Sequence, residues 1–526
     1  MSPFPRVSLR DGLIEGFEIV SSPVAVNAFL GIPFAQPPIG ELRFEKPLPA
    51  LPWQGVKETK AFCSKCNQIP DPESGENCLY LNVFAPAEKP DATPVLVLIH
   101  GGAFAMGSAQ LQGDVGIAKN LVSRGVIAVS ITYRVGGLGW FSSGDSTMPG
   151  NYGMWDATLA LQWVHDNIDS FGGDPNNVTL YGGSAAAALV DGLAMSPHSY
   201  SFFHAVITSG IGDRDVWRND YAAECRELAR DNGLLWKDSQ ELKALMKTTD
   251  LEWLKGKYFA VAEDSFDFMK LDWGMRYDGD FFPEPPEVLR SKAPAKPRIF
   301  GTAQLEGAAF TWPLKITNES VEKVVECMVP KGHEDRDVLV ANLTETYRSL
   351  ARAAEPEAVA KHAMQILRWS HILIKSDCLQ ALGERGLVAC LKHSVDQNTK
   401  IHGDTQNSWL FVFEHFNPAS YGQMYPYVSF ASHVSDEWYI TGNEKWEYTE
   451  EDHRMASFMA DVVTNFCKTS DPNGPSKLPI DFHSITPDHP DRHLVADLVP
   501  VMSEDFFGGR IKLNNDLLKS FLALSE

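Results

Sequence analysis

The sequence has few cysteines for its length. Its 526 residues include 8 cysteines, which are too few to specify a disulfide scaffold. Cys63, Cys66 and Cys78 are clustered and could close a short loop or suggest zinc, but no fourth ligand lies at a useful spacing. We therefore predict no metal site.

Targeting and membrane signals are missing as well. No apolar stretch is long enough to span a bilayer. The first residues, Met1 to Arg6, lack the charged start and apolar run of a signal peptide, and Phe521 to Glu526 carry no recognisable anchor or retention signal. We expect a cytoplasmic protein with no transmembrane segment; if a leader has been removed, the alternative is a secreted one.

Basic residues are outnumbered by acidic ones. The 46 Lys and Arg against 68 Asp and Glu give a formal net charge of −22 at pH 7. This excess disfavours nucleic acid and anionic membranes as partners. It would favour cationic substrates, although solubility alone explains it. Length suggests roughly three or four domains, but the motifs described below span nearly the whole chain, so we predict one domain over residues 1–526.

Apolar runs alternate with helical patterns along the chain. Runs such as Pro94 to Ile99 are continuous, which is typical of strands buried on both faces. Such alternation predicts an α/β fold with a mostly parallel sheet covered by helices on both faces. The predicted strands are 7–9, 16–20, 29–33, 79–84, 94–99, 126–133, 178–181, 205–208, 298–302 and 409–413, and the predicted helices are 112–124, 155–170, the stretch after Ser184, 338–354, 455–466 and 514–524.

One serine is surrounded by small residues between a strand and a helix. The stretch Thr179 to Ala186 reads TLYGGSAA, with Ser184 at the apex of the predicted strand–turn–helix. In a nucleophile elbow the serine takes a strained backbone conformation that exposes its hydroxyl group. Gly182 satisfies the need for small neighbours. Ala186 adds a methyl group where glycine is usual, and the pattern alone would more often be an ordinary turn.

A serine nucleophile needs a base, an orienting acid and donors for the developing oxyanion. Gly101 and Gly102 end a buried strand, where their N–H groups can approach a carbonyl oxygen without side-chain obstruction. The N–H of Ala185 would supply a further donor. A tight turn is the alternative explanation for the two glycines.

Several ordered blocks together resemble the type-B carboxylesterases of the cholinesterase-like α/β-hydrolase family, most closely its invertebrate members. The resemblance implies the α/β-hydrolase fold with large helical insertions, and pocket walls formed by residues 211–295 and 310–400. The matching blocks are FLGIPFA (29–35), ENCLYLNV (76–83), HGGAF (100–104), GNYG (150–153), NI (167–168) and FGGDPNNVT (171–179).

The resemblance also implies a catalytic triad. The family's acid lies in a Glu-Gly step after a sheet strand, which here is Glu306. The family's histidine lies in a His-x-x-Asp/Glu-x-x-Tyr pattern, which His433 to Tyr439 fits with Trp438 in place of the usual proline. We therefore predict Ser184 as nucleophile, His433 as base and Glu306 as orienting acid. No cofactor is implied.

By the same resemblance, Cys66 and Cys78 form a loop disulfide and leave Cys63 unpaired. Closing a loop of this size stabilises a protein by roughly 3 kcal/mol, although a cytoplasmic location would keep the thiols reduced. The resemblance also implies two structural ion pairs, Arg43–Glu76 and Arg134–Asp156.

The predicted function is hydrolysis of small-molecule carboxylic esters through an acyl-enzyme at Ser184. Two departures from the family pattern, Gly183 where glutamate is usual and the methyl group of Ala186, are expected to weaken the site. One alternative is a binding protein without activity; such relatives usually lose the serine or histidine and carry an anchor. Another is an acyltransferase, in which an alcohol replaces water in the second step. Acyl and alcohol specificity and oligomeric state are not encoded in any motif we recognise.

Overall fold

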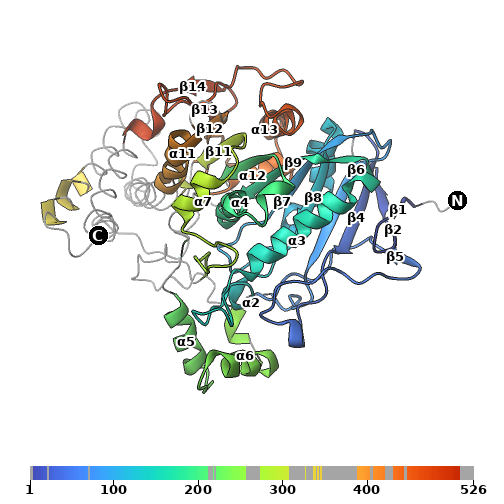
Figure 1. Ribbon diagram of the computed structural model, residues 1–526. Helices are drawn as coiled ribbons and strands as arrows, with labels where there is room; N and C mark the ends of the chain where they lie inside the picture. Colours follow the sequence, from blue (N-terminus) through green and yellow to red (C-terminus); the bar gives the residue numbers. More distant parts are fainter. Residues whose placement is uncertain are drawn as a thin grey trace.

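A central sheet organises the computed structural model, which describes residues 4–20, 23–68, 71–210, 217, 221–250, 252–255, 273–306, 326, 336–338, 340–342, 344–345, 388–402, 407–420, 430–443 and 447–509. Within these residues the sheet has 11 strands, with a 3-stranded sheet beside it (Figure 1). In spatial order the large sheet contains β14 (Val501–Ser503), β13 (His493–Ala496), β12 (Ser408–Phe413), β11 (Arg298–Ala303), β10 (Ala205–Ser209), β9 (Gly173–Gly183), β7 (Thr93–Ile99), β8 (Ile127–Ile131), β6 (Tyr80–Pro86), β4 (Val26–Pro33) and β3 (Phe17–Ile19), and the small sheet contains β1 (Arg6–Ser8), β2 (Leu13–Glu15) and β5 (Val56–Glu58).

The middle of the large sheet is parallel. Every neighbouring pair from β8 through β7, β9, β10, β11 and β12 to β13 is parallel, and antiparallel pairs occur only toward the two edges. Alternate residues of β7 enter different cores: Val97 packs on one face of the sheet and Leu98 on the other. The predicted fold class, a mostly parallel sheet buried on both faces, is confirmed.

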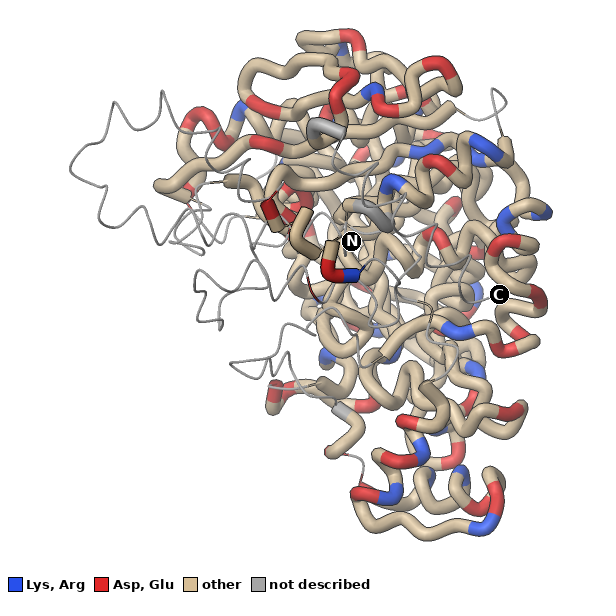
Figure 2. Tube along the Cα trace, turned by 90° about the vertical axis from the view of Figure 1, so that its left-hand side faces the viewer, with Lys and Arg blue, Asp and Glu red and all other residues tan. Residues whose placement is uncertain are grey.

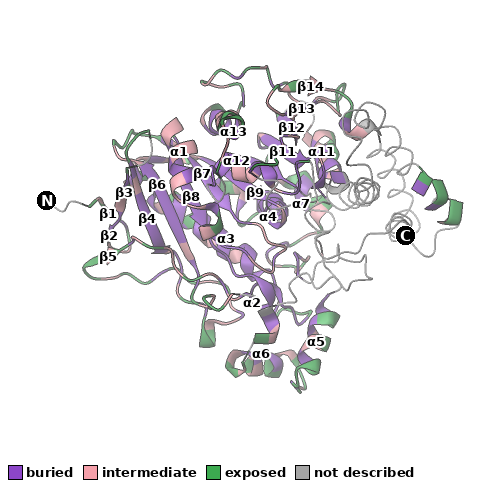
Figure 3. Cartoon of the chain, turned by 180° about the vertical axis from the view of Figure 1, so that it is seen from behind, coloured by how far each residue is buried: buried purple, intermediate pink, exposed green. Residues whose placement is uncertain are grey.

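Helices cover both faces of this sheet (Figures 1 and 3). The core of one face includes residues of α3 (Tyr152–Asn167), α4 (Ala185–Met195) and α7 (Pro286–Lys292). The core of the other includes residues of α1 (Val115–Asn120), α12 (Ser435–Thr441) and α13 (Glu450–Thr469). The described helices also include α2 (Gly136–Trp140), α5 (Ala222–Asp231), α6 (Ser239–Thr248) and α11 (Ala389–His402).

Element boundaries differ from the prediction where glycine or asparagine adopts positive φ. The predicted helix 112–124 is divided into α1 and a 3-10 turn over Val122–Arg124: Gly113, with φ 79°, precedes the start of α1, and Gly125, also with φ 79°, ends the 3-10 turn. Helix α3 begins earlier than predicted, directly after Asn151 with φ 58°. The short strands β13 and β14 were not predicted. The predicted helix 514–524 and most of 338–354 lie outside the described residues.

Charged residues are mixed along the described chain. Figure 2 shows acidic residues spread over the chain and interspersed with basic ones. In the part of the chain that the structure describes, no helix has the length and apolar character needed to cross a membrane.

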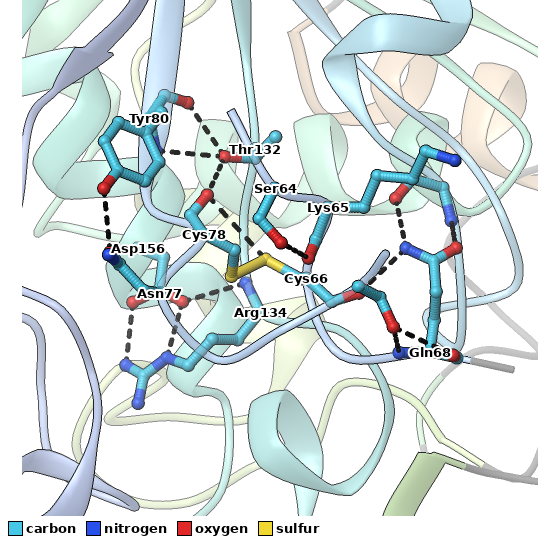
Figure 4. Close-up of a disulfide and its surroundings, with 12 residues drawn as sticks. Ser64, Lys65, Cys66, Gln68, Asn77, Cys78, Tyr80, Thr132, Arg134 and Asp156 are labelled. Atoms are coloured by element: carbon cyan, nitrogen blue, oxygen red, sulfur yellow. Dashed lines mark hydrogen bonds and ion pairs between the residues drawn. A yellow bond between two sulfur atoms is a disulfide. The ribbon is translucent and has the colours of Figure 1, made fainter. Parts of the chain in front are cut away.

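Both predicted ion pairs form, and one of them is fully buried. Arg134 binds Asp156 through two hydrogen bonds of 2.7 Å, and its backbone N–H donates to the same carboxylate at 3.0 Å (Figure 4). The guanidinium group of Arg43 binds Glu76 in the same bidentate manner, at 2.5 and 2.6 Å. Removing one partner of a buried ion pair strongly destabilises the folded protein, because the other charge is left uncompensated.

We predict that Asp156→Asn lowers the free energy of unfolding by about 3–5 kcal/mol, because the amide leaves the buried charge of Arg134 uncompensated. Urea unfolding measures the change. As a control, Glu284→Gln removes the exposed partner of Lys292, and we expect a change below about 1 kcal/mol. Equal effects of the two substitutions would contradict a special role for the buried pair.

Candidate active site

Ser184 occupies the sharp turn between β9 and α4. Its φ of 58° and ψ of −133° lie in a region that residues with a side chain rarely adopt. Its N–H donates to the Ser209 carbonyl at 2.8 Å, and its carbonyl accepts from the Ala187 N–H at 2.8 Å. A Cβ on Gly182 would lie 2.4 Å from the Ala186 carbonyl oxygen, so only glycine fits where strand and helix cross.

His433 contacts the hydroxyl group of Ser184 from 249 residues further along the chain. Nε2 of the histidine lies 2.7 Å from Oγ of the serine. Val434, with φ 53°, turns the chain directly after the histidine and starts α12. A Cβ on Gly210 would lie 3.1 Å from Cε1 of the ring, so the imidazole packs closely against the segment that follows β10.

Glu306 contacts the other side of the imidazole. Its Oε2 lies 2.5 Å from Nδ1 of His433, and the glutamate is buried. Its Oε1 accepts hydrogen bonds from the Ala303 N–H at 2.6 Å and from the Thr302 hydroxyl at 3.0 Å. Both donors belong to the end of β11, so the sheet holds the carboxylate in place.

These contacts determine the tautomer of the imidazole. A carboxylate can only accept hydrogen bonds, so Nδ1 of His433 carries the proton donated to Glu306. Nε2 is then free to accept the hydroxyl proton of Ser184. The three residues predicted from the sequence lie together in the order nucleophile, base and acid, which suits removal of the hydroxyl proton during attack on a carbonyl carbon.

The loop after β7 runs beside the turn at Ser184. A Cβ on Gly101 would lie 3.0 Å from the Cβ of Ser184 and 2.6 Å from the Gly183 carbonyl oxygen. Gly102 has φ 119°, and a Cβ there would clash with a backbone oxygen of the same loop at 2.2 Å. Ala185 is the first residue of α4. The candidate oxyanion donors Gly101, Gly102 and Ala185 therefore belong to the two segments that border the serine.

His100, which precedes this loop, is a structural residue. Its ring stacks on Tyr133 with centroids 4.5 Å apart, and the Tyr133 hydroxyl donates to the His100 carbonyl at 2.9 Å. Burial lowers the pKa of His100 to about 4, although the hydrogen bond from Nδ1 to the Gly101 carbonyl acts in the opposite direction. The imidazole is therefore neutral at pH 7 and shapes the loop.

The Cys66–Cys78 disulfide supports the far end of the same loop. The predicted pair is bonded, and Cys63 is free. Gln68 lies within the loop that the disulfide closes (Figure 4). Its side-chain oxygen accepts from the Gly107 N–H, and its amide donates to the Gly107 carbonyl, both at 2.9 Å. The sequence analysis did not identify this clamp, because no motif marks Gln68 as a partner of Gly107.

Two acids of α12, the buried Asp436 and the half-buried Glu437, were not identified from the sequence as parts of the site. Burial raises the pKa of Asp436 to about 6; the Ser209 hydroxyl opposes this shift and the charge of Glu306 adds to it. Burial also raises the pKa of Glu437 to about 7. The His-x-x-Asp/Glu pattern marked Asp436 only as a motif position. No local signal indicates where the side chain of Glu437 points.

No metal centre accompanies this arrangement: within the described residues there is no group of three or more His, Cys, Asp or Glu that could hold a metal ion.

Comparison with known proteins gives matches along almost the whole chain. The profile of the family described as "Carboxylesterase family" matches residues 3–504. "Esterase cest-33" of Caenorhabditis elegans is 31% identical over 514 residues, which cover 92% of this chain and 88% of that protein. "Bile salt-activated lipase" of Bos taurus is 31% identical over 88% of this chain and 78% of its own length. "Acetylcholinesterase" of Bungarus fasciatus is 29% identical over 90% and 79%.

We predict that Gly101→Ala slows hydrolysis of an activated ester about tenfold or more, because the added methyl group displaces the loop from the elbow, and losing an oxyanion donor entirely costs about 100- to 1,000-fold. Steady-state kinetics with a p-nitrophenyl ester measure the change. Gly75→Ala is the control, since a Cβ there meets its nearest neighbour, Ser64 Oγ, at 3.4 Å. If Gly101→Ala had wild-type kinetics, this loop would have no part in the reaction.

Proposed function

The chain belongs to the carboxylesterase family and is a carboxylic ester hydrolase, and on this premise we propose that it cleaves small-molecule esters through an acyl-enzyme at Ser184. The observation that carries the proposal is the continuous hydrogen-bonded series from Glu306 through His433 to Ser184, with distances of 2.5 and 2.7 Å. The strained backbone of the serine supports the same role, because such strain is typical of functional sites.

Acylation begins with attack of Ser184 Oγ on the ester carbonyl carbon. The hydroxyl proton passes to Nε2 of His433, and Glu306 stabilises the imidazolium that forms. The tetrahedral intermediate places negative charge on the former carbonyl oxygen, which the N–H groups of Gly101, Gly102 and Ala185 would stabilise. The imidazolium then gives its proton to the leaving alcohol as the C–O bond breaks.

Deacylation repeats these steps with water. His433 takes a proton from a water molecule while that water attacks the acyl-enzyme carbonyl carbon. The proton returns to Ser184 Oγ as the carboxylic acid leaves. No cofactor enters this sequence, since each proton moves between the substrate, water and the described side chains.

We predict that a fluorophosphonate labels Ser184 with a stoichiometry of about one per chain and abolishes hydrolysis of short p-nitrophenyl esters, because His433 activates this one hydroxyl group. Intact-mass and peptide mass spectrometry locate the label. Ser184→Ala is the matched control and should remain unlabelled. Labelling of another residue, or no labelling of the folded wild-type protein, would overturn the assignment.

We predict that Glu306→Gln lowers kcat by about 10,000-fold, because an amide group beside Nδ1 of His433 favours the wrong tautomer. His433→Ala should cost at least as much. The double variant should be little slower than His433→Ala, since a triad acts as a unit. Circular dichroism and thermal unfolding check the fold of each variant. Multiplicative losses in the double variant would mean that Glu306 acts independently of the histidine.

A further inference from the structure

Position 183, directly before the nucleophile, has no side chain, and another residue occupies its space. A Cβ built on Gly183 would lie 2.6 Å from Oε2 of Glu437 and 3.2 Å from Cγ1 of Val434. Gly183 does not have positive φ, so its backbone would accept a side chain. The obstacle to a side chain at position 183 is therefore the carboxyl group of Glu437.

Glu437 reaches the elbow from α12. The helix starts immediately after Val434, and the N–H of Glu437 donates to the Val434 carbonyl at 3.2 Å. Gln112 donates from Nε2 to the other carboxylate oxygen, Oε1, at 3.2 Å. Among the described residues no Lys, Arg or His forms an ion pair with this carboxyl group. Glu437 is half-buried as a residue, as is Ser184.

The carboxyl group lies on the side of the elbow that carries the base. The position of a Cβ on Gly183 lies close to Glu437 and also to Val434, the residue that follows His433. The candidate oxyanion loop contacts the elbow elsewhere, through the Gly183 carbonyl oxygen and the Cβ of Ser184. The carboxyl group of Glu437 therefore borders the elbow next to the residue that follows the base, while the glycine loop borders the elbow at other atoms.

We propose that Glu437 is a positioning residue of the esterase site, which supplies from α12 the carboxylate that position 183 lacks and stabilises the protonated His433 of the transition state. The proposal rests on the proposed function, because it assumes proton transfer from Ser184 to His433. It adds no chemical step: the same proton moves, and the carboxylate lowers the free energy of the state in which His433 holds it.

The charge of Glu437 depends on its surroundings. Burial raises the pKa of Glu437 to about 7, the amide of Gln112 lowers it and the charge of Asp436 on the same helix raises it. Tyr181 of β9 is the further titratable group coupled to it, and burial keeps this phenol neutral by raising its pKa well above the usual range. The carboxylate thus forms as pH rises through about 7, and kcat/KM should rise with it.

The first experiment moves the charge between the two positions. We expect Glu437→Gln to lower kcat about tenfold with little change in KM, because the charge acts on the transition state. Gly183→Glu alone should lower both activity and stability, since the two carboxyl groups would compete for one space. The double variant Gly183→Glu with Glu437→Ala should recover activity to within about threefold of wild type. The matched control, Gly183→Gln with Glu437→Ala, fills the same volume without charge and should remain slow.

The second experiment needs no change at the elbow. Gln112→Leu removes the amide that stabilises the carboxylate, so the rise of kcat/KM near pH 7 should move to higher pH. In a Glu437→Gln background the same substitution should cause no shift. This comparison assigns the rise of kcat/KM near pH 7 to Glu437 even if the double variants at position 183 do not fold.

Fluorophosphonate labelling distinguishes the possible failures. A wild-type protein that is not labelled at Ser184 would overturn the proposed function and this inference together. A labelled protein in which Glu437→Gln has wild-type kcat and an unchanged pH profile would overturn the inference alone. Equal recovery by the glutamate and glutamine double variants would also overturn it, because volume rather than charge would then be the cause.

Discussion

The close crossing of β9 and α4 is the constraint on which the site depends. The backbone at Gly182 meets the Ala186 carbonyl so closely that no side chain fits, and the strained Ser184 follows two residues later. Such strain persists only where the surroundings enforce it. Here β9 lies between β7 and β10 in the middle of the sheet, and every residue of α4 is buried. Asp191 of α4 also forms ion pairs with Arg290 of α7 and Arg298 of β11, which fix the helix to a neighbouring helix and strand.

The remaining site residues lie on loops at the same end of the sheet, because parallel strands bring their carboxyl ends to one edge. Loop pairing then adjusts their position: the N–H of Leu305 donates to the Ala431 carbonyl at 2.9 Å, which aligns the loop of Glu306 with the loop of His433. Gln68 and the disulfide do the same for the glycine loop through Gly107. Short contacts between backbones, each formed by residues distant in sequence, therefore determine distances in the site.

The sequence alone was sufficient for features determined locally or by a chain-long motif pattern. Buried strands such as β7 were predicted because their apolar runs are continuous, and Ser184, Glu306 and His433 because each lies in a motif of fixed order. Boundaries failed where backbone conformation decides, as at Gly113 and Asn151. The short strands β13 and β14, at one end of the large sheet, carry too little pattern to be recognised. The contact between Gly183 and Glu437 could not be predicted, because it depends on the direction that α12 takes after the loop of His433.

That contact changes the meaning of the departure at position 183. From the sequence, glycine in place of the usual glutamate indicates a lost carboxylate and a weaker site. In the structure, the space beside the elbow holds a carboxyl group in any case, contributed by a helix that begins two residues after His433. The space admits one such group: a side chain at position 183 would start 2.6 Å from Oε2 of Glu437. Glycine at 183 is therefore the condition under which α12 can bring its own acid to the elbow, and the two positions are physically coupled although neither is in the triad.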